Sequence, residues 1–292
     1  MIEVNQAMKN GIEEQDNVLK LSLDNNITIL AENHPSVWFA FSPSCVAMCE
    51  LINVDNCSGK VVMDLAAGSG VLGIVAAKNG AAQVICTDLN PEAVTASKRN
   101  WELNHLNPKQ LKSLQSNCFS GIKGNPEFEG KIDRIYLNPP ALPDTQEKLQ
   151  GRLKSAIETP AGEWNRNGQR GRLVMDSLIV EGKSYLSPGG EILFIATSKN
   201  GSRLTARLMQ QHWGKGIENS GEDPLDYAIN WEERGEANWA VVHRLDIPLK
   251  DYHLEFVPLY EQLAEEEGES SPFVEQDGNL YQKLYFIRAQ NH

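Results

Sequence analysis

The sequence predicts an α/β fold in which helices cover both faces of a mostly parallel sheet. Three observations predict this class. From residue 61 onward, short apolar runs alternate with segments of helical spacing. The first run leads into a glycine-rich turn at Asp64–Gly70, and a later run leads into Asn138-Pro139-Pro140. Open parallel sheets bind ligands at the carboxyl ends of their strands, so both loops lie where a ligand site is expected.

The N-terminal part precedes this alternating pattern. Residues 18–31 alternate apolar and polar side chains on both sides of Asp24-Asn25-Asn26, which predicts a hairpin with a turn at its centre. Residues 43–54 have helical spacing after a Ser-Pro start. We therefore expect a hairpin extension and one helix ahead of the parallel sheet.

The central part of the chain alternates between strands and helices. Its expected strands are 61–65, 83–87, 111–115, 132–137 and 191–197. Its expected helices are 71–78, 91–104, 173–186 and 202–212. Asn90 and Pro91 suit the N-cap and the first turn of the second helix, and the Ser187–Gly190 turn ends the third.

The last third of the chain differs in composition. Residues 214–236 are rich in Gly, Asn and acids, whereas residues 241–247 and 280–287 have the pattern of two more strands. An insertion between those strands carries the acidic run Glu265–Glu269. Two interpretations stay open for this stretch, a lid or recognition segment and a solvated edge loop.

Composition excludes several classes of protein. The chain carries 39 acids against 27 bases, a formal charge of −12, which argues against non-specific binding of phosphate backbones. Its five cysteines form no CxxC pair and its six histidines lack metal-ligand spacing, so buried thiols are expected and no metal site. There is no apolar leader and no apolar run near the ~18 residues of a membrane span, so a soluble, cytoplasmic protein without a membrane partner is expected.

The glycine-rich loop suggests a nucleotide-like ligand. Its glycines let the backbone approach a ligand closely, and Asp88 ends the next strand, where a carboxylate can accept two ribose hydroxyls. Gly68–Gly73 also fits G-x-G-x-x-G, so an NAD-dependent oxidoreductase stays open on this feature alone. Asp64 would repel an anionic pyrophosphate, but it suits a cationic group such as the α-ammonium of an amino acid.

The Asn138-Pro139-Pro140 loop suggests an acceptor site for N–H groups. Asn138 and Pro139 each precede a proline and are therefore driven to extended conformations. The Asn138 carboxamide oxygen and a nearby backbone carbonyl are both hydrogen-bond acceptors. Together they can hold an amine or amide and leave its nitrogen lone pair aimed at an electrophile. The alternative is an ordinary proline-rich turn.

From about Phe41 to Ser198 the chain resembles the class I S-adenosylmethionine-dependent methyltransferases. It looks like their small-domain branch, which includes the release-factor glutamine methyltransferases and the N6-adenine methyltransferases. The resemblance is carried by FSPS at 41–44, DLAAGSG at 64–70, GVLGIVAAKNGA at 70–81, TDLNPEAVTASKRNWELN at 87–104 and LNPPALP at 137–143. It implies a Rossmann-like sheet of seven strands, with an N-terminal hairpin extension at 1–40, a cofactor-binding core at 41–200 and a C-terminal part at 201–292 that completes the sheet and carries substrate-side insertions.

The resemblance also implies roles for single residues. The catalytic group would be Asn138, Pro139 and Pro140. The S-adenosylmethionine site would comprise Asp64, Ala66, Gly68, Gly70, Asp88, Leu89, Asn117, Cys118 and Asn138. Of these, Asp88 would take the ribose hydroxyls and Leu89 would pack on the adenine. Ala66 replaces a glycine usual in the family, and Asn117 replaces an aspartate.

The substrate side departs from the family pattern. Ala141 stands where the family's N-P-P-Y motif has an aromatic ring that packs on a planar target. Such a ring would have to come from elsewhere, for example from Phe41 or Trp164. Arg166 and Arg170, in a loop rich in Gly, Asn and Arg, would meet a carboxylate or phosphate, unless that loop is merely solvated.

The function expected is methyl transfer from S-adenosylmethionine to a nitrogen, with S-adenosylhomocysteine as the product. The acceptor expected is a protein side chain or a small polar amine. An RNA or DNA adenine is the alternative, disfavoured by the net charge and by Ala141. An NAD-dependent oxidoreductase and a non-catalytic module that only binds the cofactor are further alternatives.

Overall fold

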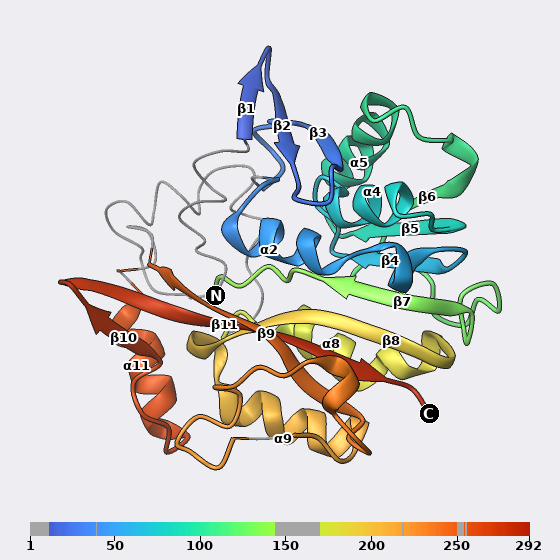
Figure 1. Cartoon of the computed structure of the whole chain (residues 1–292). Helices are drawn as coiled ribbons and strands as arrows, with labels where there is room; N and C mark the ends of the chain where they lie inside the picture. Colours follow the sequence, from blue (N-terminus) through green and yellow to red (C-terminus); the bar gives the residue numbers. More distant parts are fainter. Residues whose placement is uncertain (1–11, 39, 144–169, 218, 250–253, 255) are drawn as a thin grey trace. The chain divides into compact units, whose positions relative to one another are not determined.

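The computed structural model describes residues 12–38, 40–143, 170–217, 219–249, 254 and 256–292 (Figure 1). These residues fall into two compact units. Unit 1 comprises Met1–Asn138 and Glu181–Glu191, and unit 2 comprises Pro139–Val180 and Ile192–His292. The units follow a different division from the expected segments 1–40, 41–200 and 201–292, which stay a prediction.

Unit 1 begins with a small antiparallel sheet. Its strands, in the order of the sheet, are β1 (Ile12–Gln15), β2 (Val18–Ser22) and β3 (Thr28–Glu32). Leu19 lies opposite Ala31 and Leu21 opposite Ile29, and these four side chains are buried on one face. The predicted hairpin is therefore confirmed, because the apolar positions alternate with period two. Strand β1 is an addition that the sequence pattern did not predict.

Two short helices lead into the parallel sheet. Helix α2 (Pro43–Leu51) starts at Ser42, whose Oγ accepts a hydrogen bond from the Cys45 N–H at 3.3 Å. Helix α3 (Val54–Cys57) starts at Asn53 and carries a capping box. The predicted helix over 43–54 therefore ends early, at Leu51, Ile52 is extended, and a separate helix begins at Val54.

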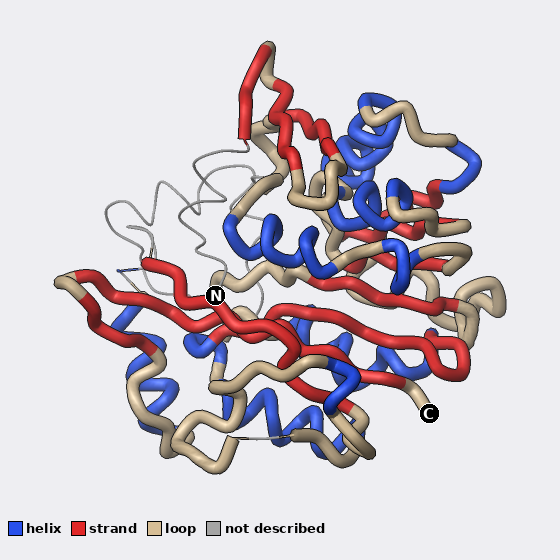
Figure 2. Tube along the Cα trace, viewed as in Figure 1, coloured by secondary structure: helices blue, strands red, loops and turns tan. Residues whose placement is uncertain are grey.

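The parallel sheet of unit 1 has four strands in the order β7-β4-β5-β6, which are labelled in Figure 1 and drawn in red in the same view in Figure 2. These are β4 (Val61–Leu65), β5 (Gln83–Asp88), β6 (Leu111–Gln115) and β7 (Ile132–Leu137). All three pairings between neighbours are parallel. Helices α4 (Val71–Lys78) and α5 (Pro91–Leu103) and the 3₁₀ turn η1 (Pro108–Gln110) connect the first three strands. Parallel neighbours need such crossovers, so the alternation in the sequence is confirmed.

The end of unit 1 contains the turn η2 (Gly182–Tyr185) and the first part of strand β8 (Leu186–Thr197). Strand β8 is shared, because Leu186–Glu191 belongs to unit 1 and Ile192–Thr197 to unit 2. The predicted third helix ends early, at Glu181, and the strand begins at Leu186 instead of residue 191. The Ser187–Gly190 segment was expected to be a turn but is part of this strand.

Unit 2 combines the second part of β8 with antiparallel strands. Strand β11 (Asn279–Gln290) pairs with β9 (Trp239–Pro248) and with β10 (Phe273–Gln276). Its helical elements are α8 (Leu173–Glu181), η3 (Ser198–Asn200), α9 (Ser202–Trp213), η4 (Trp231–Glu233) and α11 (Val257–Glu266). Trp213, Trp239 and Phe286 are fully buried here.

The described strands of the main sheet number eight where the sequence predicts seven, and the additional strand is β10. The predicted mixed α/β architecture with a mostly parallel central sheet is confirmed. The acidic run Glu265–Glu269 lies at the end of α11 and in the turn after it. Among the described residues, no helix combines the length and the apolar character needed to cross a membrane.

Candidate functional site

Three loops of unit 1 meet at the carboxyl ends of neighbouring strands. Leu65 at the end of β4 lies opposite Thr87, and Asp88 at the end of β5 lies opposite Gln115. The Ala67 N–H donates to the Thr87 carbonyl at 2.9 Å, and the Ser116 N–H donates to the Asp88 carbonyl at 2.8 Å. The loops that follow β4, β5 and β6 are therefore tied together by backbone hydrogen bonds, as a ligand site at this edge requires.

The glycine-rich loop is wound through left-handed backbone conformations. Ala66, Gly68 and Gly70 have φ angles of 54°, 54° and 78°. A Cβ on Gly68 would meet no atom within 4 Å, so this glycine faces open space at the surface of the loop. A Cβ on Gly70 would come 2.9 Å from the Ser97 Cβ, so this glycine allows close contact with α5. Gly68 thus leaves room for a ligand, while Gly70 is needed for packing.

The Asp88 carboxylate is held rigidly at the end of β5. Its Oδ2 accepts from the Gly68 N–H at 2.8 Å and its Oδ1 accepts from the Asn90 N–H at 2.9 Å. Burial raises the pKa of Asp88, and these backbone N–H groups oppose that rise. Each carboxylate oxygen can accept more than one hydrogen bond, so both can still receive hydroxyl groups of a ribose. The next side chain, Leu89, is 47% exposed.

Asp64 lies deeper than Asp88. Its side chain is 1% exposed, and its Oδ2 accepts from the Gly73 N–H at 2.9 Å. The pKa of Asp64 is raised to about 8. Burial is the largest cause of the rise, the Gly73 N–H opposes it, and the nearby charge of Asp88 adds to it. The carboxyl group is therefore mostly protonated at neutral pH, and a cation beside it would favour the ionised form.

The loop after β6 holds the next pair of predicted cofactor residues. Asn117 is exposed, and Cys118 is half-buried with a φ of 50°. The Ser116 Oγ donates to the Cys118 carbonyl at 2.6 Å, which fixes this turn beside the end of β5. The five cysteines carry free thiols, and four of them are buried.

Asn138 follows directly on β7, the strand that flanks β4 on the other side. Tyr136 lies opposite Asp64 in that pairing. Asn138, two residues further along, therefore lies at the same edge of the sheet as the start of the glycine-rich loop. The residue is half-buried, and its side-chain amide has no hydrogen-bond partner among the residues that the structure describes. Its oxygen is therefore available to a ligand. Pro139 and Pro140, which follow in unit 2, are half-buried.

Three of the residues predicted for the substrate side, Phe41, Ala141 and Arg170, lie among the described residues. Phe41 is 1% exposed, which does not favour the expected stacking of its ring on a substrate. In unit 2, the Ala141 carbonyl accepts from the Tyr260 hydroxyl at 3.3 Å. Arg170 pairs with Glu267 at 3.3 Å and so holds α11, instead of presenting a free charge. Trp164 and Arg166 lie outside the described residues.

A residue that the sequence analysis did not select contacts the glycine-rich loop. Asn100 on α5 is 0% exposed and donates from Nδ2 to the Ser69 carbonyl at 2.8 Å. A possible signal in the sequence is the row of small polar residues Ser97, Asn100 and Asn104, whose spacing places them on one face of a helix.

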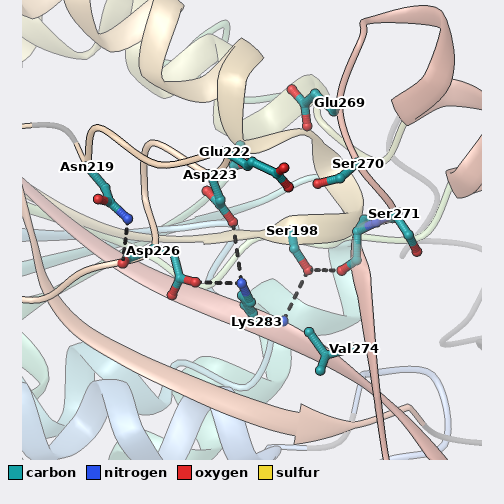
Figure 3. A pocket seen from close by; sticks show the side chains of 12 residues that line it. Ser198, Asn219, Glu222, Asp223, Asp226, Glu269, Ser270, Ser271, Val274 and Lys283 are labelled. Carbon is teal, nitrogen blue, oxygen red and sulfur yellow. Dashed lines mark hydrogen bonds and ion pairs between the residues drawn. The ribbon is translucent and has the colours of Figure 1, made fainter.

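Unit 2 contains a polar cavity of about 220 Å³ (Figure 3). Its lining comprises Ser198, Ser202, Asn219, Glu222, Asp223, Asp226, Glu269, Ser270, Ser271, Pro272, Val274 and Lys283. The Lys283 Nζ lies 2.6 Å from Asp226 Oδ2, and the Tyr285 hydroxyl donates to Asp223. These acids are thus compensated within unit 2, and the predicted site residues do not line the cavity.

Comparison with known proteins identifies the class. The family model of ribosomal protein L11 methyltransferase (PrmA) matches residues 43–135. The putative protein N5-glutamine methyltransferase of Methanocaldococcus jannaschii is 31% identical over 178 residues, which cover 61% of this chain and 80% of that protein. The release factor glutamine methyltransferase of Borreliella burgdorferi is 28% identical over 153 residues, 52% of this chain and 50% of that protein.

Solved structures agree on the fold. A methyltransferase complexed with S-adenosylhomocysteine superimposes with a TM-score of 0.55 at 14% identity, over 95% of this chain and 57% of that chain. The chain thus spans four fifths of the M. jannaschii relative but only about half of the others. The NAD-dependent alternative finds no support in these comparisons. The chain belongs to the S-adenosylmethionine-dependent methyltransferase family that includes the M. jannaschii protein.

Proposed function

We propose that this methyltransferase modifies a side-chain nitrogen of a protein, with the carboxamide of glutamine as the foremost candidate. The observation that carries the proposal is the Asn138 amide, which follows β7, is partly accessible and has no partner among the described residues. The names of two relatives, a protein N5-glutamine and a release factor glutamine methyltransferase, support the choice of acceptor.

The residues of unit 1 fit the cofactor. When bound, S-adenosylmethionine supplies a methyl group activated by a positively charged sulfur. The open space at Gly68 would take its methionine part, and the ionised Asp64 would favour the positive charges of that part. Asp88 would accept the ribose hydroxyls, and the exposed Leu89 would cover one face of the adenine.

Asn138 would orient the acceptor. An amide nitrogen is a weak nucleophile because its lone pair is delocalised, so its N–H groups must be held while the lone pair faces the methyl group. The Asn138 oxygen and the Pro139 carbonyl are acceptors only, so they would fix two N–H groups without protonating the nitrogen. The acceptor nitrogen then gains the methyl group and loses one of the two held protons to solvent, so no nucleophilic side chain is required.

The net charge supports a protein acceptor over a nucleic acid. At −12, the chain as a whole repels phosphate backbones at a distance. The absence of a ring at position 141 removes the stacking partner that a flipped base would need. A small polar amine is the second candidate, because Ala141 leaves more space beside the motif than an aromatic side chain.

Transfer of radiolabelled methyl groups tests the proposal. Cell extract is incubated with the enzyme and labelled S-adenosylmethionine, then separated into protein, nucleic acid and small-molecule fractions. We expect label in protein, in a form that yields N5-methylglutamine after proteolytic digestion. Asn138→Ala should lose at least about tenfold in rate, because the amide no longer holds the acceptor. Its affinity for S-adenosylhomocysteine should change little.

The control variant is Asn125→Ala, which changes an asparagine in the segment between β6 and β7. It should methylate like the wild type. Label that appears only in nucleic acid would refute the acceptor class. An Asn138→Ala variant with the wild-type rate would refute the role of the amide.

A further inference from the structure

The side chain of Asn100 connects two parts of unit 1. Its Nδ2 donates to the Ser69 carbonyl at 2.8 Å, and its Oδ1 accepts from the Glu32 N–H at 2.8 Å. Ser69 lies in the glycine-rich loop, and Glu32 lies at the end of β3 in the N-terminal sheet. Asn100 is completely buried, so water cannot replace either partner.

The contact with Ser69 fixes one peptide group of the loop. The Ser69 carbonyl and the Gly70 N–H belong to the same planar peptide. Asn100 holds the carbonyl, and the Ala67 carbonyl accepts from the Gly70 N–H at 2.8 Å. The carbonyl and the N–H of this peptide group therefore each have a hydrogen-bond partner, and the two partners lie on opposite sides of it. Its rotation would change the φ and ψ angles on either side and thus the course of the loop at Gly68.

The packing of α5 leaves the loop little freedom to shift instead. A Cβ on Gly70 would approach the Ser97 Cβ to 2.9 Å and the Ser97 Cα to 3.3 Å. The loop backbone thus lies directly on the helix, one turn before Asn100. A second fixed point is the Gly68 N–H, which donates to Asp88 at 2.8 Å.

The other end of Asn100 belongs to a row of hydrogen bonds along the edge of β3. Asn104, one turn further along α5, accepts from the Leu30 N–H at 3.0 Å and donates to the Leu30 carbonyl at 2.7 Å. Asn100 binds the N–H of Glu32, two residues along the strand. The two amides thus occupy the place that a neighbouring strand would take. Only Asn100 also reaches the glycine-rich loop.

We propose that Asn100 is a positioning residue for the cofactor site. It holds the Ser69–Gly70 peptide in the orientation that keeps the space at Gly68 open to the methionine part of S-adenosylmethionine. Through Glu32 it makes this orientation dependent on the N-terminal sheet, which itself lines no predicted part of the site. The proposal rests on the cofactor and is independent of the acceptor.

Asn100→Asp separates the two contacts of the side chain. In its ionised form the new carboxylate keeps an acceptor for the Glu32 N–H but has no hydrogen to donate to the Ser69 carbonyl, so binding is measured at several pH values up to pH 9. Asn104→Asp is the control, because it makes the same chemical change at the residue that ends α5 and on the same strand, without a contact to the loop. The Asn104 Nδ2 also donates to the Asn100 backbone carbonyl at 2.8 Å, a contact that Asn100→Asp leaves in place. Binding of S-adenosylhomocysteine is measured by calorimetry, and the thermal midpoint is measured without ligand.

We expect both variants to have a lower thermal midpoint, because each loses a buried donor. Only Asn100→Asp should bind S-adenosylhomocysteine at least tenfold more weakly, whereas Asn104→Asp should stay within twofold of the wild type. Amide exchange at Gly68, Ser69 and Gly70 should be faster in Asn100→Asp alone. If Asn100→Asp does not fold, Asn100→Ser replaces it: this shorter, uncharged side chain removes both contacts, and Asn104→Ser is then the control.

Wild-type affinity in the Asn100 variants, or an equal loss in the Asn104 control, would overturn the positioning role. Failure of the wild type to bind S-adenosylhomocysteine would instead contradict the methyltransferase activity itself. The two failures are therefore distinguishable, since the binding assay contains no acceptor.

Discussion

Without ligand, Asp64→Asn should be more stable than the wild type, by a margin that grows as the pH rises. The same variant should bind the cofactor more weakly. Asp64 is 1% exposed, and the charge of Asp88 lies nearby. At neutral pH the folded protein must therefore either hold a charged carboxylate in its interior or keep a proton that the unfolded chain has released. Either state lowers the stability of the fold. An asparagine has a similar shape, stays neutral and keeps an oxygen for the Gly73 N–H.

The size of the effect follows from the pKa of Asp64. The folded pKa of about 8 lies above the ordinary value of 3.8, so the folded protein binds the proton more tightly than the unfolded chain. The free energy of unfolding therefore falls as the pH rises from 3.8 to 8, by up to about 1.4 kcal/mol per pH unit. At pH 7 the accumulated loss has an upper limit of about 4 kcal/mol, which local relaxation and water reduce.

Urea unfolding of the two proteins between pH 4.5 and 8.5 measures this difference. The advantage of Asp64→Asn should grow with pH and level off above pH 8. Asp55→Asn, which changes an exposed acid on α3, is the control for the loss of one acidic group from unit 1. A constant difference for Asp64→Asn, or a variant less stable than the wild type at pH 8, would refute the reasoning.

Binding supplies an independent check on the same residue. The α-ammonium group of S-adenosylhomocysteine would favour the ionised carboxylate, so wild-type binding near pH 7 should release a proton. Calorimetry in two buffers of different ionisation enthalpy detects this release. Asp64→Asn should bind more weakly and release none, and equal proton release from both proteins would exclude Asp64 as the source.

Two further predictions concern the glycine-rich loop. Ala66→Gly should raise the free energy of unfolding by about 1 kcal/mol, because Ala66 has a φ of 54° and only glycine adopts this conformation without strain; an unchanged urea midpoint would contradict this. Gly70→Ala should lower it by about 1–3 kcal/mol, because the new Cβ would lie 2.9 Å from the Ser97 Cβ and the φ of 78° disfavours alanine. Urea unfolding measures both, and wild-type stability of Gly70→Ala would show that α5 can move away.

Strands β4 and β5 could be predicted closely because most of their residues are buried and they read as nearly continuous apolar runs. Strands β4, β6 and β7 have the predicted bounds, and β5 is one residue longer. Strands β1 and β10 were missed because each has four residues, most of them exposed, and so lacks a clear pattern. The strand β8 runs through Ser187–Gly190 because pairing in the sheet outweighed the local preference for a turn.

The site could be predicted in part for a related reason. Loops that follow strands of a parallel sheet must meet at one edge, so the approach of the glycine-rich loop to Asp88 follows from the order of elements alone. Pairings between distant segments have no such local pattern. The ion pair of Arg170 with Glu267 and the burial of Phe41 depend on the tertiary structure, and the sequence therefore did not indicate them.

The N-terminal sheet is joined to the cofactor loops by buried amides. The Asn90 side chain donates to the Ser36 carbonyl at 2.7 Å and accepts from the Glu92 N–H, so the residue that caps α5 also holds the chain that follows β3. Asn100 and Asn104 hold β3 itself. A chain that began at residue 41 would lack the Ser36, Glu32 and Leu30 groups that these amides bind, and it would uncover the face of α5 on which β3 lies. The hairpin is therefore better regarded as part of the cofactor-binding unit than as a separate extension. The side-chain amides of Asn100 and Asn104 complete their hydrogen bonds only when β3 is in place.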